Sequence, residues 1–231
     1  MKIRTTLLCS AFLAALTVTF AGKVPMTQSQ QSGTTPQQAL DSLLKGNERY
    51  VNGELSEIDF EGSIKTAASG QYPQAYVLSC VDSRVPVEMV FDQGIGDIFV
   101  GRVAGNVENE DQIGSMEFAT KYAGAKLVMV LGHEACGAVK GACAGVEDGN
   151  LTLLLEKIAP AINSVDGFKA SERTVENKKF VDEVIANNVS RTVSDIRSRS
   201  AILSSMEANG DIKIVGGVYS LQTGAVELIE H

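Results

Sequence analysis

Short apolar runs that alternate with longer amphipathic stretches constrain the fold of this chain most. Residues 75–81 and 126–132 are almost continuously apolar, as expected for strands buried on both faces of a parallel sheet. Further strands are expected at residues 98–100, 212–219 and 225–229. Helices are expected around them, at residues 36–51, 108–122, 151–162 and 175–208. This alternation predicts an α/β domain with a mainly parallel β-sheet of about four to five strands flanked by helices.

The N-terminal segment, residues 1–21, has the pattern of a secretory signal peptide. Lys2 and Arg4 supply its positive start. Residues 5–20 form an uncharged run that is shorter than the roughly 20 apolar residues of a membrane-spanning helix. We therefore expect an exported protein, periplasmic or secreted, rather than a membrane anchor. No membrane contact is expected of the chain after cleavage.

The length of 231 residues suits one domain with short appendages. Residues 22–38 are rich in Gln, Ser, Thr and Pro and have almost no large apolar side chain, so we expect a flexible tether there. Residues 39–231 then form the folded domain. The chain has 20 Lys and Arg against 28 Asp and Glu, a net charge of −8, and no basic run. Nucleic acid is therefore not an expected partner, because phosphate binding depends on clustered Lys and Arg.

Cysteine and histidine are scarce, so each can be interpreted separately. Loss of the signal peptide removes Cys9 and leaves Cys80, Cys136 and Cys143. An odd number of cysteines in an oxidising compartment argues against a purely structural set of disulfides. We expect Cys143 to be a small buried thiol. A Cys80–Cys136 disulfide is the main alternative to a metal that holds both thiolates.

Two of the expected strands end in residues that can bind a soft metal. The strand at 75–81 leads into Cys80 and Asp82, and the strand at 126–132 leads into His133 and Cys136. The carboxyl ends of parallel strands lie at one edge of a sheet, where ligands collect. Two thiolates and one imidazole form a zinc ligand set with a fourth position left for water or substrate. Asp82 could either take that fourth position or pair with Arg84 and leave it open.

Several motifs, in the right order, give the chain a resemblance to the β-class carbonic anhydrases. The main ones are Cys-Val-Asp-Ser-Arg-Val-Pro at 80–86 and Gly-His-Glu-Ala-Cys-Gly-Ala at 132–138. Supporting motifs stand at residues 46–50, 70–73, 96–100 and 102–106, and together they span nearly the whole expected domain. The family carries Ser or Thr after the ligand His in many members, where this chain has Glu134.

The resemblance implies reversible hydration of CO2 to bicarbonate and a proton by zinc-bound hydroxide, with one Zn²⁺ per chain. It implies that Cys80, His133 and Cys136 bind the zinc and that Asp82 and Arg84 form a catalytic dyad. It also implies a homodimer, or a larger oligomer built from dimers, whose active sites lie at the subunit interface. The positions implied to contact substrate, some of them from the neighbouring subunit, are Gln71, Phe99, Ala104, Phe118 and Gly137.

Three alternatives stay open from the sequence. The same fold and zinc could serve a hydrolase of carbon–sulfur analogues of CO2. A zinc saturated by Cys80, Asp82, His133 and Cys136 would instead be a closed structural or bicarbonate-responsive module. An exported scaffold held by a disulfide is the third alternative, and it predicts a protein without metal.

Overall fold

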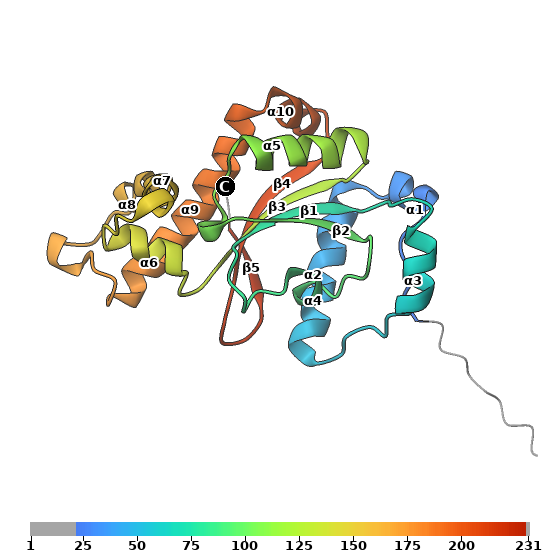
Figure 1. Ribbon diagram of the computed structural model, residues 1–231, viewed down its shortest axis with the longest axis horizontal. Helices are drawn as coiled ribbons and strands as arrows, with labels where there is room; N and C mark the ends of the chain where they lie inside the picture. Colours follow the sequence, from blue (N-terminus) through green and yellow to red (C-terminus); the bar gives the residue numbers. More distant parts are fainter. Residues whose placement is uncertain (1–21, 230–231) are drawn as a thin grey trace, which may run out of the picture.

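The computed structural model describes residues 22–229 (Figure 1). The expected signal peptide, residues 1–21, lies outside the described residues. Within the described range, no helix has the length and apolar character needed to span a membrane.

A five-stranded sheet forms the centre of the molecule, in the order β2-β1-β3-β4-β5. The first four of these strands run parallel, and β5 pairs with β4 in the antiparallel sense. β5 can be antiparallel because only residues 220–225 connect it to β4, whereas parallel neighbours need a long crossover. The expected α/β domain with a mainly parallel sheet is therefore confirmed. The strands are β1 (Ala75–Ser79), β2 (Ile98–Arg102), β3 (Leu127–His133), β4 (Lys213–Tyr219) and β5 (Val226–Ile229).

Helices cover both faces of the sheet, with α2 and α4 on one side and α5, α9 and α10 on the other (Figure 1). The α-helices are α1 (Gln28–Gly33), α2 (Pro36–Asn52), α3 (Phe60–Ala67), α4 (Val87–Val90), α5 (Glu110–Glu117), α6 (Gly137–Cys143), α7 (Gly149–Glu156), α8 (Ala159–Asn163), α9 (Lys178–Arg199) and α10 (Ala201–Ala208). Shorter helical segments are η1 (Ala104–Asn106), the π-helical turn η2 (Phe118–Tyr122) and η3 (Ala170–Glu172).

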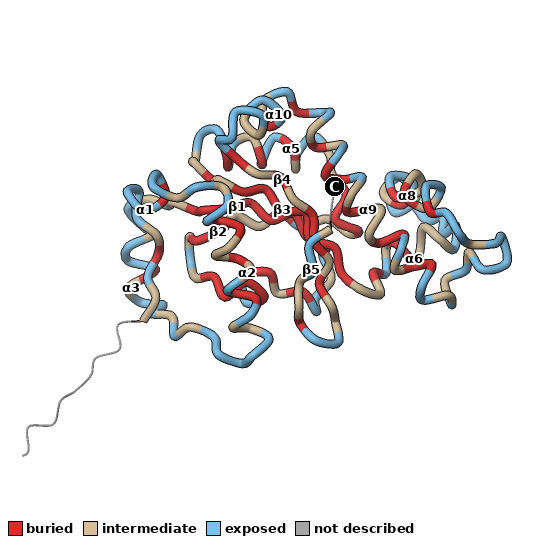
Figure 2. Tube along the Cα trace, turned by 180° about the vertical axis from the view of Figure 1, so that it is seen from behind, coloured by how far each residue is buried: buried red, intermediate tan, exposed pale blue. Residues whose placement is uncertain are grey.

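The two faces of the sheet have separate cores because successive strand residues point in opposite directions. Val77 of β1 belongs to the core under α2, together with Leu43 and Phe91. The next residue, Leu78, belongs to the core under α5 and α9, together with Met116. Figure 2 shows the buried residues concentrated in the strands and on the helix sides that face them. All residues of β1 and β3 are buried, which explains their continuous apolar sequence.

A third core lies beyond the carboxyl ends of the strands. It joins α6, α7 and α8 to the first half of α9, and these helices form the lobe at the left of Figure 1. Cys80 and Cys136 belong to this core, together with Ile158 and Phe180. The lobe therefore shields from water the edge of the sheet at which the expected metal ligands lie.

The long helix expected at residues 175–208 is two helices in the structure. Ser200 interrupts it with an extended backbone (φ −118°, ψ 101°). Its hydroxyl accepts a hydrogen bond from the Leu203 N–H and donates one to the Glu117 carboxylate. An N-capping serine offers the chain a way to begin a new helix at this point.

The expected helices at 108–122 and 151–162 are also divided. The first becomes α5 followed by the π-helical turn η2. The second becomes α7 and α8, with Pro160 in the first turn of α8. Proline has no backbone N–H to donate, so it fits the start of a helix better than its interior.

The prediction of a flexible tether at residues 22–38 is wrong. A capping box between Thr27 and Gln30 begins helix α1 within this segment. Gln31 is buried, and its amide group donates to the carbonyl oxygens of Pro73 and Ala123, both at 2.8 Å. The Lys23 ammonium lies 2.9 Å from the buried Asp97 carboxylate. These polar side chains bind to groups of the folded domain, a role that composition alone does not reveal.

Replacing Gln31 with Ala should lower the free energy of unfolding by about 1–3 kcal/mol, because two carbonyl oxygens lose their donor. Urea denaturation measures this change. Ser29→Ala, an exposed position on the same helix, is the matched control and should change the free energy of unfolding by less than about 0.5 kcal/mol. Equal stability of the two variants would mean that the two hydrogen bonds of Gln31 do not stabilise the fold.

Candidate metal centre

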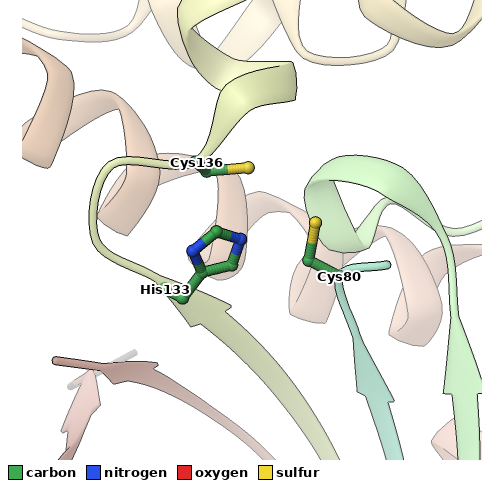
Figure 3. Close-up of side chains that lie close together, drawn as sticks. All are labelled: Cys80, His133 and Cys136. Carbon is green, nitrogen blue, oxygen red and sulfur yellow. The ribbon is translucent and has the colours of Figure 1, made fainter. Parts of the chain in front are cut away.

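The expected metal ligands come together at the carboxyl ends of two neighbouring strands. β1 and β3 pair in parallel with Ser79 opposite Leu131, so Cys80 and His133 follow at the same edge. Cys136 stands three residues after His133, at the N-cap of α6. The ligand atoms of these three residues all lie within 4.8 Å of one another. Figure 3 shows the two sulfur atoms and the imidazole facing a common centre.

The His133 ring has one nitrogen in use and one free. Nδ1 lies 2.9 Å from the carbonyl oxygen of Glu134, to which it can donate. Nε2 is then the unprotonated nitrogen, and it is fully buried without a hydrogen-bond partner. Buried polar atoms are rarely left unpaired, and a metal would satisfy this one. The donor set of imidazole and two thiols is the type that zinc prefers.

The two cysteines are free thiols, so no disulfide joins Cys80 to Cys136 in the structure. The pKa of Cys80 is lowered chiefly by a hydrogen bond from the Cys136 thiol and further by the Gly105 N–H, although burial acts in the opposite direction. The pKa of Cys136 is raised, because Cys80 holds its proton and because the thiol is buried. A bound cation would favour the thiolate form of both residues, because metal ligands must be deprotonated.

A backbone N–H supports the Cys80 sulfur from the side of η1. The Gly105 N–H lies 3.3 Å from Sγ of Cys80, and the Asn188 amide donates to the Gly105 carbonyl oxygen at 2.8 Å. Gly105 has a φ of +70°, and a Cβ atom there would lie only 2.8 Å from the side chain of Ile158. Glycine is therefore needed for this close approach.

Neither Gly105 nor Asn188 was expected at the site. Asn188 is 2% exposed and lies among the apolar residues of α9 that face the sheet and the lobe, such as Val184 and Val189. An asparagine at a buried position of an amphipathic helix is the one sequence signal that could have indicated its role.

Asp82 pairs with Arg84 in the structure. Oδ1 of Asp82 accepts from the backbone N–H and from Nε of Arg84, both at 2.9 Å, and Oδ2 accepts from Nη2 at 2.7 Å. These hydrogen bonds hold the pKa of Asp82 well below its usual range, against a smaller effect of burial. Oδ2 lies 3.7 Å from Nε2 of His133, so the carboxylate borders the cluster without belonging to it. Of the two expected roles for Asp82, the structure therefore shows the pairing with arginine.

Arg102, at the end of β2, fixes the loop that carries this dyad. Its Nε donates to the carbonyl oxygen of Cys80 at 2.8 Å, and its Nη2 donates to that of Asp82 at 2.5 Å. A planar guanidinium that binds both carbonyls restricts the peptide between them. The direction of the Asp82 side chain thus depends on the strand pairing of β1 with β2.

The expected substrate-contacting residues fall into two groups. Ala104 and Gly137 lie beside the cluster, because Ala104 precedes Gly105 and Gly137 follows Cys136.

Gln71 comes before β1, whereas Cys80 comes after it, so the length of the strand, on the order of 16 Å, separates them. Phe99 and Phe118 contact each other, with ring centroids 6.3 Å apart, and Phe118 is 54% exposed. The structure does not bring these last three residues to the cluster of their own chain.

Comparison with known proteins identifies the family. The sequence model of the family described as "Carbonic anhydrase" matches residues 75–226. The chain belongs to the carbonic anhydrase family. Carbonic anhydrase 2 of Mycobacterium tuberculosis is 36% identical over 209 residues, which cover 86% of this chain and 95% of that protein. The carbonic anhydrase of Mycolicibacterium smegmatis is also 36% identical, over 207 residues and with the same coverage.

Solved structures of β-carbonic anhydrases share the fold. The Coccomyxa β-carbonic anhydrase in complex with acetazolamide matches with a TM-score of 0.64 at 22% identity, over 84% of this chain and 82% of that one. The β-carbonic anhydrase CafA of Aspergillus fumigatus matches with a TM-score of 0.62 at 24% identity, over 72% and 80% of the two chains. The resemblance stated from the sequence motifs is thus confirmed for family and fold.

Replacing Cys80 with Ser should abolish stoichiometric metal binding by this carbonic anhydrase, because one of the three converging ligand atoms is lost. The zinc content of purified protein, measured by elemental mass spectrometry, checks this. Cys143→Ser is the matched control: Cys143 is a half-buried free thiol outside the cluster, and its loss should leave the zinc content unchanged. Full zinc occupancy in the Cys80 variant would contradict the assignment.

Proposed function

We propose that this protein is a zinc enzyme that catalyses the reversible hydration of CO2 to bicarbonate and a proton. The observation on which the proposal rests is the buried cluster of Cys80, His133 and Cys136, with an unpaired imidazole nitrogen, beside an Asp82–Arg84 pair. Membership of the carbonic anhydrase family supports it. Cys80, His133 and Cys136 would hold the zinc. The zinc would supply hydroxide near neutral pH, and its two thiolate ligands would shift that deprotonation to more alkaline pH than three imidazoles would.

The dyad orients the nucleophile. An ionised carboxylate can only accept hydrogen bonds, so Asp82 would accept one from an O–H group at the metal position and hold that group in a fixed orientation toward CO2. Arg84 holds both carboxylate oxygens and prevents the side chain from turning toward the metal position. Arg102 keeps the supporting loop in place. The residues beside the nucleophile thus supply orientation, which is where much of the rate enhancement of an enzyme arises.

The alternatives stated from the sequence receive no support. A closed zinc site needs Asp82 as a ligand, whereas the structure commits Asp82 to Arg84. A disulfide scaffold needs a bond that the free thiols Cys80 and Cys136 do not form. A hydrolase of carbon–sulfur analogues also receives no support, because the relatives described above are all named carbonic anhydrases.

Replacing Asp82 with Asn should lower kcat for CO2 hydration by about 10²-fold and leave zinc content unchanged, because the amide presents a donor where the carboxylate accepts. Stopped-flow CO2 hydration between pH 6.5 and 9 measures this. Wild-type activity should rise with pH and in proportion to bound zinc. Ser83→Ala, at the exposed neighbouring position, is the control and should retain wild-type kcat. Zinc-loaded wild-type protein without CO2 hydration at any pH would overturn the proposed function.

We further propose that the protein is a homodimer, or a larger oligomer built from dimers, with active sites that combine residues of two subunits. β2 is an edge strand, and the neighbouring surface exposes Phe118 and, at 73%, Tyr122, whose rings stack 6.5 Å apart. Exposed aromatic clusters of this kind are typical of interfaces. Gln71 and Phe118, which lie away from the metal centre of their own chain, would then serve that of the neighbour. A structural relative, from Sordaria macrospora, is described as tetrameric.

Mixing two inactive variants tests this shared site. Cys80→Ser removes the metal centre of its own subunit, and Gln71→Ala removes the contribution of its subunit to the neighbour. A dimer with one subunit of each kind keeps one intact site. Refolding an equal mixture should therefore restore roughly a quarter of wild-type activity per chain, by binomial mixing of subunits in a two-fold dimer. Activity no higher than the mean of the two separate variants would show that Gln71 does not act across subunits.

We also propose export to the periplasm or secretion, with residues 1–21 as a cleaved signal peptide. The support is the sequence pattern of two positive residues followed by an uncharged run. Intact-mass measurement on protein from cell fractions tests this, and an uncleaved chain confined to the cytoplasm would contradict it.

A further inference from the structure

The turn between β3 and α6 holds two ligands of the metal centre in a strained backbone. It contains His133 and Cys136, and between them Ala135 has a φ of +51°. This left-handed region is sterically unfavourable for a residue with a Cβ atom. Such a conformation persists only when its surroundings hold it in place. The contacts that hold this turn therefore also hold the two metal ligands in position.

Glu134 provides these contacts with three different parts of the residue. Its N–H donates to the carbonyl oxygen of Tyr219 at 3.0 Å, at the end of β4. Its carbonyl oxygen accepts from Nδ1 of His133 at 2.9 Å. Its carboxylate oxygen Oε2 accepts from the Ser220 hydroxyl and from the Leu221 N–H, both at 3.0 Å. The residue between the ligands is thus tied to β4 and to the turn that follows it.

The carboxylate is used chiefly for these hydrogen bonds. Its other oxygen, Oε1, lies 3.5 Å from Nζ of Lys178, but that ammonium is bound more closely by Asp182, at 2.6 Å. The Glu134 side chain is 24% exposed. A carboxylate that accepts from a hydroxyl and a backbone N–H together has a defined orientation, which a solvated surface carboxylate lacks.

We propose that Glu134 is a positioning residue for the metal centre. Its carboxylate accepts hydrogen bonds from Ser220 and Leu221 and so connects the turn between β3 and α6 to the turn between β4 and β5. This fixes the Glu134 peptide, whose carbonyl receives the His133 Nδ1–H and so aims Nε2 at the centre. The proposal rests on the proposed function in assuming that the centre binds zinc. It also couples the metal centre to the turn before β5, the antiparallel strand at the edge of the sheet.

The test is the rate at which the zinc-loaded protein releases zinc to an excess of chelator. Glu134→Ala should release zinc about 10- to 100-fold faster than wild type, because partners outside the ligand shell have effects of that size on metal affinity. Glu134→Gln should stay within about threefold of wild type, since its amide oxygen can still accept both hydrogen bonds. Asp182→Ala is the matched control. It removes a neighbouring carboxylate that binds the same lysine but does not contact the turn, and it should release zinc at the wild-type rate.

The absorption spectrum of the cobalt-substituted protein gives a second readout that does not depend on activity. Its d–d bands should shift in Glu134→Ala and keep the wild-type pattern in Glu134→Gln, because the first variant changes ligand geometry. Ser220→Ala removes the hydroxyl donor while keeping the carboxylate, and it should speed zinc release by a smaller factor than Glu134→Ala.

Two results would overturn the proposal. One is zinc release at the wild-type rate in Glu134→Ala or, if that variant does not fold, in Ser220→Ala. The other is equally fast release from Glu134→Gln and Glu134→Ala, which would assign the effect to charge rather than to positioning. A protein that binds zinc but does not hydrate CO2 would defeat the proposed function and leave this test intact.

Discussion

The parallel pairing of β1 with β3 at the centre of the sheet is the constraint on which the metal centre depends. These strands place Cys80 and His133, 53 positions apart in the chain, at the same edge of the sheet. Both strands are completely buried, so a shift in their register would move apolar side chains from one core to the other. The hydrophobic cores on the two faces therefore maintain the relative position of the ligands. Stability of the fold and geometry of the site have the same physical origin.

Around the cluster, backbone groups provide most of the polar support. The Gly105 N–H contacts the Cys80 sulfur, and the Glu134 carbonyl orients His133. Side chains act one step further out: Asn188 and Arg102 bind carbonyl groups of the loops rather than the ligand atoms. This arrangement suits a buried centre, because main-chain groups held by strands and helices have little freedom to move. The lobe of α6, α7 and α8 completes it by excluding water.

The sequence predicted the sheet well, because buried parallel strands require continuous apolar residues that are visible without any knowledge of neighbours. Helix boundaries were less predictable. The break at Ser200 depends on Glu117, which accepts the serine hydroxyl from a distant part of the chain. The contacts of residues 22–38 with the domain are hard to predict for a related reason. Gln31 is a polar residue whose burial is stabilised by two carbonyl groups far away in the sequence. The polar composition of the segment therefore indicates a flexible tether, because these distant partners cannot be seen in the sequence.

For the site, the residue types and their positions were enough to predict the ligand chemistry. The scarcity of Cys and His, and their positions after two apolar runs, were sufficient to select Cys80, His133 and Cys136. Three features depend on the folded structure and are not visible in the sequence. Asp82 pairs with Arg84, Gly105 and Asn188 support a ligand, and Gln71 lies at the far end of β1 from its own metal centre. The physical reason is that residue type sets what a side chain can bind, and motif spacing sets where along the chain it lies. Which partner it meets depends on hydrogen bonds and strand packing between segments that are remote in sequence.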